Sequence, residues 1–231
     1  MIRPIAQRAL VLDTPRLRLR PWTSDDEDLC LDLLCDPAVM RFVGQALTEA
    51  EARAHMPNAL RRGAGGRLGI WCVLDRATGE KIGDGVLTPV PIETEDPDWA
   101  QLVPDVYPDA AIEVGYLLKP GAWGQGFATE ICARLLRFAF QQTALAQVVA
   151  CTDPDNRASQ NVLRKCGMRD CGPARAYASD VAWFEITCGI DAQIAPVTLI
   201  PHQPAHGVRV LIRLGFWHRE IHVFFLPEPA Q

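Results

Sequence analysis

Residues 111–130 read AIEVGYLLKPGAWGQGFATE and combine an apolar run, a glycine turn and the start of a periodic pattern. The apolar run 112–118 is bounded by Pro120-Gly121 and is too short to span a membrane, which is typical of a strand. Directly after Gly124-Gln125-Gly126, apolar residues recur at helical spacing over residues 127–138. The segment therefore predicts a strand, a tight turn and a helix, in that order.

The turn is suited to receiving an anion. Gly124 and Gly126 have no Cβ atom, so their backbone amides can approach a ligand closely. The helix that follows adds unpaired N–H groups and a partial positive charge at its start. Between Ala111 and Glu130 the only carboxylate is Glu113, at the far end of the strand. We therefore expect a ring of free amides with no competing negative charge.

Several glycine-turn interpretations compete for this segment. A dinucleotide-binding turn requires G-x-G-x-x-G, and Thr129 stands where the third glycine belongs. The phosphate loop of nucleotide hydrolases requires G-x-x-x-x-G-K-[ST], and Gly-Lys-Ser/Thr does not occur in the chain. An ordinary strand-to-helix turn without a ligand is a further alternative.

The hexapeptide WGQGFA at residues 123–128 resembles the acyl-CoA loop of the GNAT superfamily of N-acetyltransferases, [QR]-x-x-G-x-[GA]. Trp123 replaces the opening Gln or Arg of that motif, as it does in the ribosomal-protein N-terminal acetyltransferase (RimJ/RimL-like) branch. A second match, DPDNRASQNVLRKCGM at residues 153–168, resembles the fifth strand and fourth helix of the family. The segments TPRLRLRPW and DPAVMRFVG resemble the opening of the same branch, so the resemblance covers roughly residues 12–188.

The resemblance implies a fold and a domain division. We expect an α/β protein of the GNAT fold, with a central twisted mixed sheet flanked by helices and a C-terminal extension. Residues 1–188 form the acetyltransferase domain in this prediction, and residues 189–231 form the extension. In the extension we expect strands, either a hairpin on the main sheet or a dimerisation element of a homodimer. A partial repeat is the alternative, because VLIRLGF at residues 210–216 echoes VLRKCGM at residues 162–168.

The resemblance also implies where acetyl-CoA binds. The pantetheine arm pairs with backbone near the end of the 112–118 strand, the diphosphate meets the amides of the glycine turn, and an Asn reaches the cofactor arm or the acceptor. The expected cofactor-binding residues are Leu117, Leu118, Trp123, Gly124, Gln125, Gly126, Phe127, Ala128, Thr129 and Asn156.

Two residues are candidates for acid–base chemistry. A primary amine is mostly protonated at neutral pH, so a base must remove a proton before the amine attacks a thioester. Glu113 matches the position of a carboxylate in many relatives, although an ordinary strand-edge carboxylate is the alternative. Leu163 stands where many relatives have a tyrosine that protonates the departing thiolate. Ser159 is the nearest donor, unless it is only a first-turn helix hydroxyl.

The expected function is transfer of the acetyl group of acetyl-CoA directly to a primary amine, without a covalent enzyme intermediate. The acceptor is either a protein N-terminal α-amine or a small amine. A noncatalytic acyl-CoA-binding or assembly domain of the same fold is the alternative from another class.

Composition and charge indicate which classes of binding partner and which cellular compartment to expect. A formal net charge of −5 disfavours nonspecific nucleic-acid binding, and we expect no membrane contact and no signal peptide. The eight cysteines contain no C-x-x-C pair, which favours reduced thiols in the cytoplasm. Two H-x-x-x-H pairs occur in the tail, at His202/His206 and His218/His222, but Pro204 argues against a helix at the first pair, so no metal is expected.

Two features outside the motifs need an explanation. Residues 68–74 and 81–87 predict a hairpin in which Gly83 and Gly85 indicate a bulge or a close contact. Residues 89–109 carry six acidic residues and five prolines but no Lys or Arg. This insert is either a solvated acidic loop or an acidic rim that attracts a cationic amine.

Overall fold

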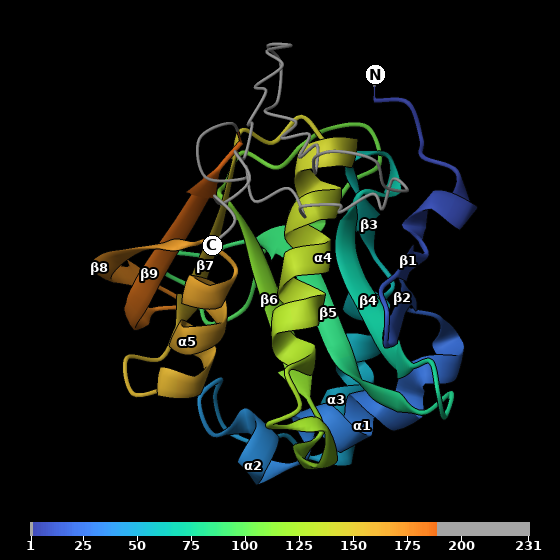
Figure 1. Cartoon of the computed structure of the whole chain (residues 1–231), viewed down its shortest axis with the longest axis vertical. Coiled ribbons are helices and arrows are strands. Elements are labelled where there is room, and N and C mark those ends of the chain that lie inside the picture. The colour runs from blue at the N-terminus through green and yellow to red at the C-terminus, as the bar shows by residue number, and fades with distance from the viewer. Residues whose placement is uncertain (1, 189–231) are drawn as a thin grey trace, which may run out of the picture. The chain divides into compact units, whose positions relative to one another are not determined.

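The structure is a computed structural model of the chain, and it describes residues 2–188 (Figure 1). The predictions for the extension, namely the hairpin, the dimerisation element, the repeat and the histidine pairs, lie outside the described residues.

The described residues form one sheet with helices on both faces. The strand order is β1-β2-β4-β5-β6-β7-β9-β8, and the short β3 pairs with β4. The strands are β1 (Leu12–Asp13), β2 (Leu17–Pro21), β3 (Arg62–Gly63), β4 (Leu68–Asp75), β5 (Lys81–Pro89), β6 (Ile112–Leu118), β7 (Gln147–Thr152), β8 (Arg169–Ala176) and β9 (Ser179–Thr187). The α-helices are α1 (Glu27–Leu34), α2 (Pro37–Met40), α3 (Glu49–Ala59), α4 (Phe127–Gln142) and α5 (Arg157–Lys165).

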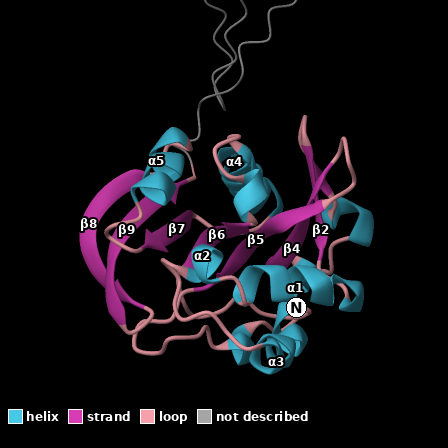
Figure 2. Ribbon diagram, turned by 90° about the horizontal axis from the view of Figure 1, so that it is seen from below, coloured by secondary structure: helices cyan, strands magenta, loops and turns pink. Residues whose placement is uncertain are grey.

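The helices divide between the two faces of the sheet. Figure 2 shows α4 and α5 on one face, with α1, α2 and α3 on the other. This arrangement is the mixed α/β sheet flanked by helices that the sequence predicted.

The sheet opens between β6 and β7. These two strands are parallel, and their register contains a single pair, Glu113 opposite Val149. By contrast, β5 and β6 pair continuously from Gly83 opposite Leu118 to Pro89 opposite Ile112. The strands β6 and β7 therefore diverge beyond Glu113, and we call this divergence the notch.

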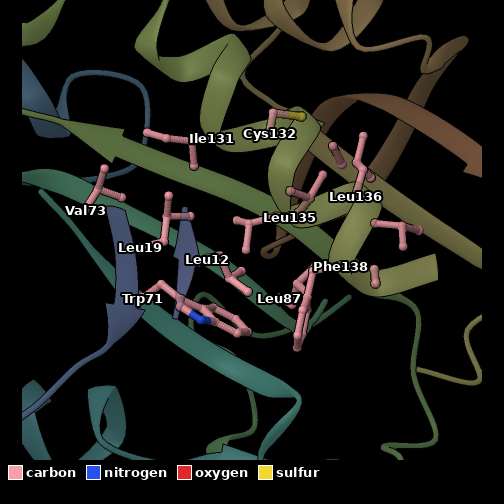
Figure 3. Close-up of a cluster of buried hydrophobic side chains, with 14 of the residues drawn as sticks. Leu12, Leu19, Trp71, Val73, Leu87, Ile131, Cys132, Leu135, Leu136 and Phe138 are labelled. Carbon is pink, nitrogen blue, oxygen red and sulfur yellow. The ribbon is translucent and has the colours of Figure 1, made fainter. Parts of the chain in front are cut away.

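The largest part of the core lies between the sheet and α4, as Figure 3 shows. Trp71 of β4 meets Phe138 of α4 edge-on, with ring centroids 5.6 Å apart. A Cβ atom on Gly85 would lie 2.8 Å from Ile131 Cγ2 and 2.9 Å from Leu135 Cδ1. The close contact predicted at Gly85 is thus confirmed, because only a glycine lets α4 pack directly on β5.

Two boundaries differ from the sequence-based prediction. In the sequence, Thr48 and Glu51 stand at the positions of a capping box and predict a helix that runs to about Arg62. The helix α3 ends at Ala59 instead, because Arg62 and Gly63 leave to pair with β4. The strand β8 was not anticipated, since Gly172-Pro173 is a poor strand sequence. The structure accommodates the pair with a register shift between Asp170 and Pro173.

Candidate active site

The turn before α4 exposes a set of free backbone amides. Gly124 and Gly126 adopt left-handed φ angles of +73° and +79°, which favour glycine. Within the described residues, the amide N–H groups of residues 124–129 donate to no protein acceptor. The first amide of this region that is bonded is that of Glu130, which donates to Gly126 O at 3.2 Å. We call residues 124–129 the amide cup.

Arg16, which lies just before β2, braces this cup from a distant part of the chain. Its guanidinium donates to Gln125 O at 2.8 Å and stacks over the Phe127 ring, 4.5 Å from the centroid. It also pairs with Glu130 at 2.7 Å, and Thr14 Oγ1 donates to the same carboxylate. The one acidic side chain in the first turn of α4 is therefore neutralised by Arg16.

Leu117 and Leu118, which were expected to contact the pantetheine arm, direct their backbone groups toward opposite neighbours of β6. The Leu117 amide donates to the Asp84 carboxylate at 3.0 Å, so it faces β5 and not the notch. Strand alternation turns the backbone of Leu118 and Tyr116 the other way, toward β7. The Leu118 carbonyl already accepts a hydrogen bond from Trp123 Nε1 at 2.7 Å. The amides of Tyr116 and Leu118 are thus the backbone groups directed toward the notch.

Across the notch, Asn156 and Ser159 begin α5. Asn156 Oδ1 accepts a hydrogen bond from the Ser159 amide at 3.1 Å, which caps the helix and leaves the Asn156 amide nitrogen without a described partner. The Ser159 hydroxyl lies 3.0 Å from the Tyr116 hydroxyl of β6. Burial raises the pKa of Tyr116, so this phenol keeps its proton at neutral pH. Tyr116 was not predicted as a site residue, although a hydroxyl within the apolar run 112–118 was a signal for it.

Glu113 lies where β6 and β7 part, and it is only 7% exposed. Tyr177 donates to its Oε1, and Cys151 Sγ lies 3.3 Å from its Oε2. Burial raises the pKa of Glu113, while the hydrogen bonds from Tyr177 and Cys151 oppose that rise. We call these three residues the base cluster. Neither Tyr177 nor Cys151 was singled out from the sequence.

Asp84 is a second buried carboxylate that the sequence analysis did not identify. It is 7% exposed, and among the described residues it accepts a hydrogen bond only from the Leu117 amide. Burial raises its pKa to about 7. The signal was available, because an acidic residue in the middle of the β5 sequence KIGDGVL breaks an otherwise apolar and glycine pattern.

Three further findings concern metals, thiols and membranes. The part of the chain that the structure describes contains no group of three or more potential metal ligands. All eight cysteines are free thiols. Between residues 2 and 188, none of the helices combines the length and apolar character that a membrane crossing needs.

Known proteins resemble the chain in sequence and in structure. The family model described as an acetyltransferase (GNAT) domain matches residues 16–169. The FsC-acetyl coenzyme A-N(2)-transacetylase of Aspergillus fumigatus is 35% identical over 162 residues, which is 68% of this chain. The match spans 64% of that relative's own length, slightly under two thirds.

Solved structures share the fold at lower identity. An acetyltransferase from Agrobacterium tumefaciens superposes with a TM-score of 0.61 at 24% identity, covering 76% of this chain and 93% of that one. RimL, a ribosomal L7/L12 alpha-N-protein acetyltransferase in complex with coenzyme A, gives a TM-score of 0.58 at 16% identity. That match covers 79% of this chain and 99% of RimL.

Proposed function

This chain belongs to the GNAT acetyltransferase family, and we propose that it transfers the acetyl group of acetyl-CoA directly to a primary amine. An acetyl-CoA-dependent acyltransferase is the activity class of this family, as the sequence predicted. The proposal rests on two features that the strand β6 brings into one site. The free amides of the cup follow the end of the strand, and a buried carboxylate lies near its beginning, where the sheet opens.

We assign the amide cup to the diphosphate of the cofactor. Its donors are unpaired, the helix that begins there contributes partial positive charge, and Arg16 neutralises the nearby Glu130. The amides of Tyr116 and Leu118 and the amide nitrogen of Asn156 are the groups we assign to the pantetheine arm. Trp123 supports the arm indirectly, because its indole is already committed to the Leu118 carbonyl.

We assign Glu113 the role of general base. The acceptor ammonium gives a first proton to this carboxylate, and its nitrogen then forms a bond to the thioester carbonyl carbon. Collapse breaks the C–S bond, and the electron pair leaves on sulfur. As the amide forms, the nitrogen gives its second proton to the hydroxyl that protonates the sulfur, and Glu113 releases the first proton to solvent, so charge and protons balance.

The proton for sulfur comes, in this proposal, from the Ser159 hydroxyl. The Ser159 hydroxyl takes up the second proton of the nitrogen in return, and the Tyr116 hydroxyl, 3.0 Å away, shares in this transfer while keeping its own proton overall, so the two form a short relay. This relay takes the place of the tyrosine that Leu163 replaces in α5. Leu163 is buried, and as an aliphatic side chain it carries no donor.

We propose a primary amine on a small molecule as the acceptor. The relative with 35% identity acts, by its name, at an N(2) nitrogen, which favours a primary amine on a small molecule. RimL acts on a protein α-amine, but at 16% identity it supports only the fold, so the RimJ/RimL-like branch and a protein N-terminus come second. The free thiols support a reducing compartment, and we place the reaction in the cytoplasm.

One experiment separates this enzyme from a noncatalytic acyl-CoA-binding domain. The purified full chain is mixed with acetyl-CoA and a panel of small amines and N-terminal peptides, and released thiol is measured with a chromogenic disulfide. Calorimetry with CoA is run in parallel. Amine-dependent thiol release supports the enzyme. Binding of CoA without release from any amine supports the binding domain, and absence of CoA binding overturns both.

A further inference from the structure

A two-residue turn between β8 and β9 carries one member of the base cluster. Tyr177 and Ala178 form this turn, and both have φ of +53°. Ala176 and Ser179 pair on either side of them. Hairpin turns of this kind favour Asn and Gly, because side chains with a Cβ are strained at positive φ by about 1 kcal/mol or more each. This chain has a tyrosine at the first position of the turn despite that cost.

The acidic insert holds this turn in place. The Tyr177 amide donates to Pro91 O and the Ala178 amide donates to Ile92 O, both at 3.0 Å. The Arg175 guanidinium reaches the Glu93 carboxylate at 3.1 Å. The first residues of the insert therefore dock on the hairpin through backbone groups, which do not depend on the acidic side chains.

The docked turn directs the Tyr177 hydroxyl onto the base. Its side chain packs against a small buried cluster formed by Val90, Val149, Ala176 and Val181. The phenol donates to Glu113 Oε1, across 64 residues of sequence. A carboxylate has about four acceptor positions, so Glu113 can hold Tyr177 and Cys151 and still receive a proton from an acceptor amine.

We propose that Tyr177 is a positioning residue for this reaction: held by the insert, its hydroxyl orients Glu113 and stabilises the carboxylate form that serves as the base. The inference rests on the proposed function, because it requires Glu113 to act as the base. It also gives the insert a role that differs from an acidic rim, namely to support the hairpin that carries the tyrosine.

The groups around Glu113 determine in which direction its pKa should change when the Tyr177 hydroxyl is removed. Within the described residues, the titratable groups that face it are Tyr177 from the turn and Cys151 from β7, while Asp96 of the insert acts on Tyr177. A hydrogen bond donated to a carboxylate lowers its pKa. Removing the phenol therefore raises the pKa of Glu113 further, so a higher pH is needed to keep the base charged.

The test is Tyr177→Phe, with Tyr107→Phe as the matched control. Tyr107 belongs to the acidic insert, but its hydroxyl accepts from the Ala144 amide and, within the described residues, makes no hydrogen bond to a member of the base cluster. In Tyr177→Phe we expect the fall of kcat/KM on the acid side of the pH profile to begin at a higher pH than in the wild type. On this limb kcat/KM should be about tenfold below the wild-type value, and at higher pH the two profiles should meet. Tyr107→Phe keeps the wild-type profile.

A second measurement follows the carboxyl carbon of Glu113 directly. In protein labelled with ¹³C-glutamate, the Glu113 resonance is assigned with Glu113→Gln and titrated in both tyrosine variants, with thermal melts to confirm folding. A higher Glu113 pKa in Tyr177→Phe alone supports the inference, even without turnover. An unchanged pKa, or a rate loss that is equal at every pH, overturns it. If Glu113→Gln leaves the rate unchanged, the base assignment itself is wrong.

Discussion

The amide cup and the base cluster are built in opposite ways. The cup is one continuous run of backbone, and its first residues, Gly124 to Gly126, are exposed. In the base cluster Glu113 is buried while Cys151 and Tyr177 are half-buried, and the three side chains come from separate elements. Glu113 lies 38 residues from Cys151 and 64 residues from Tyr177 along the chain.

The two parts of the site should differ in how well they tolerate substitution. Backbone donors at a helix start depend on local conformation, so side chains in the cup can vary as long as its glycines keep their φ angles. The ionisation of a buried carboxylate depends on every neighbour, because burial and hydrogen bonds act on the same group. Single substitutions should therefore affect catalysis more strongly in the base cluster than they affect binding in the cup.

The largest expected effect is that of Glu113→Gln. Loss of the base should lower kcat by about 100-fold or more and leave the Kd for CoA unchanged. In the wild type, kcat/KM should fall as the pH falls through the pKa of Glu113, which burial raises above its usual 4.5, and this limb should vanish in the variant. Steady-state rates across pH measure both effects.

The exposed Glu80→Gln serves as a control for that variant. It removes a carboxylate from the turn between β4 and β5 and should change neither rate nor pH profile. If Glu113→Gln behaved like this control, Glu113 would be an ordinary structural carboxylate.

Gly126→Ala should have the next largest effect, on binding. An alanine at φ of +79° is strained by about 1–2 kcal/mol, and relief of that strain moves the amides of the cup. We expect the Kd for CoA to rise about tenfold, with little change in kcat at saturation. Gly121→Ala is the matched control, because a Cβ atom there meets nothing within 4 Å. Equal affinities in both variants would contradict the role of the cup.

Arg16→Ala removes a side chain from a distant part of the chain that braces the cup. The variant loses the hydrogen bond to Gln125 O and the ion pair with Glu130. We expect CoA to bind about fivefold more weakly by calorimetry. Arg18→Ala, which removes an exposed pair with Asp13, should leave the affinity unchanged. Equal effects of the two variants would mean that Arg16 does not support the cup.

Glu93→Gln should have the smallest effect and distinguishes two roles of the insert. Its pair with Arg175 is exposed on both sides, at 69% and 51%, and such pairs contribute little. If the insert acts through its backbone contacts to the hairpin, KM for the amine should stay within twofold of the wild type. A tenfold higher KM for a cationic amine would favour an acidic rim.

The same contrast explains what the sequence could predict. The strand, the turn and the helix at residues 112–142 follow from local spacing, and they appear where they were expected. The capping box of Thr48 and Glu51 is equally local and is confirmed. Glycine turns and helix caps are decided by neighbouring residues, so a pattern is enough to find them.

The partners of Glu113 could not be predicted in this way. Tyr177 belongs to a hairpin whose first strand, β8, contains Gly172-Pro173 and has no clear strand pattern. The turn itself lacks the usual Asn or Gly and depends on the insert for its hydrogen bonds. Tyr116 and Asp84 left weak signals, as polar residues within apolar strands, but only the packed sheet shows which side chains they meet.

The most direct test of the cup is a titration of its own amides. In ¹⁵N-labelled protein, the ¹H–¹⁵N resonances of residues 124–129 are followed during addition of CoA and, separately, of pantetheine, which lacks the diphosphate. We predict large shifts of these resonances with CoA and none with pantetheine. Saturating CoA that leaves these amides unchanged would contradict the assignment of the diphosphate to the cup.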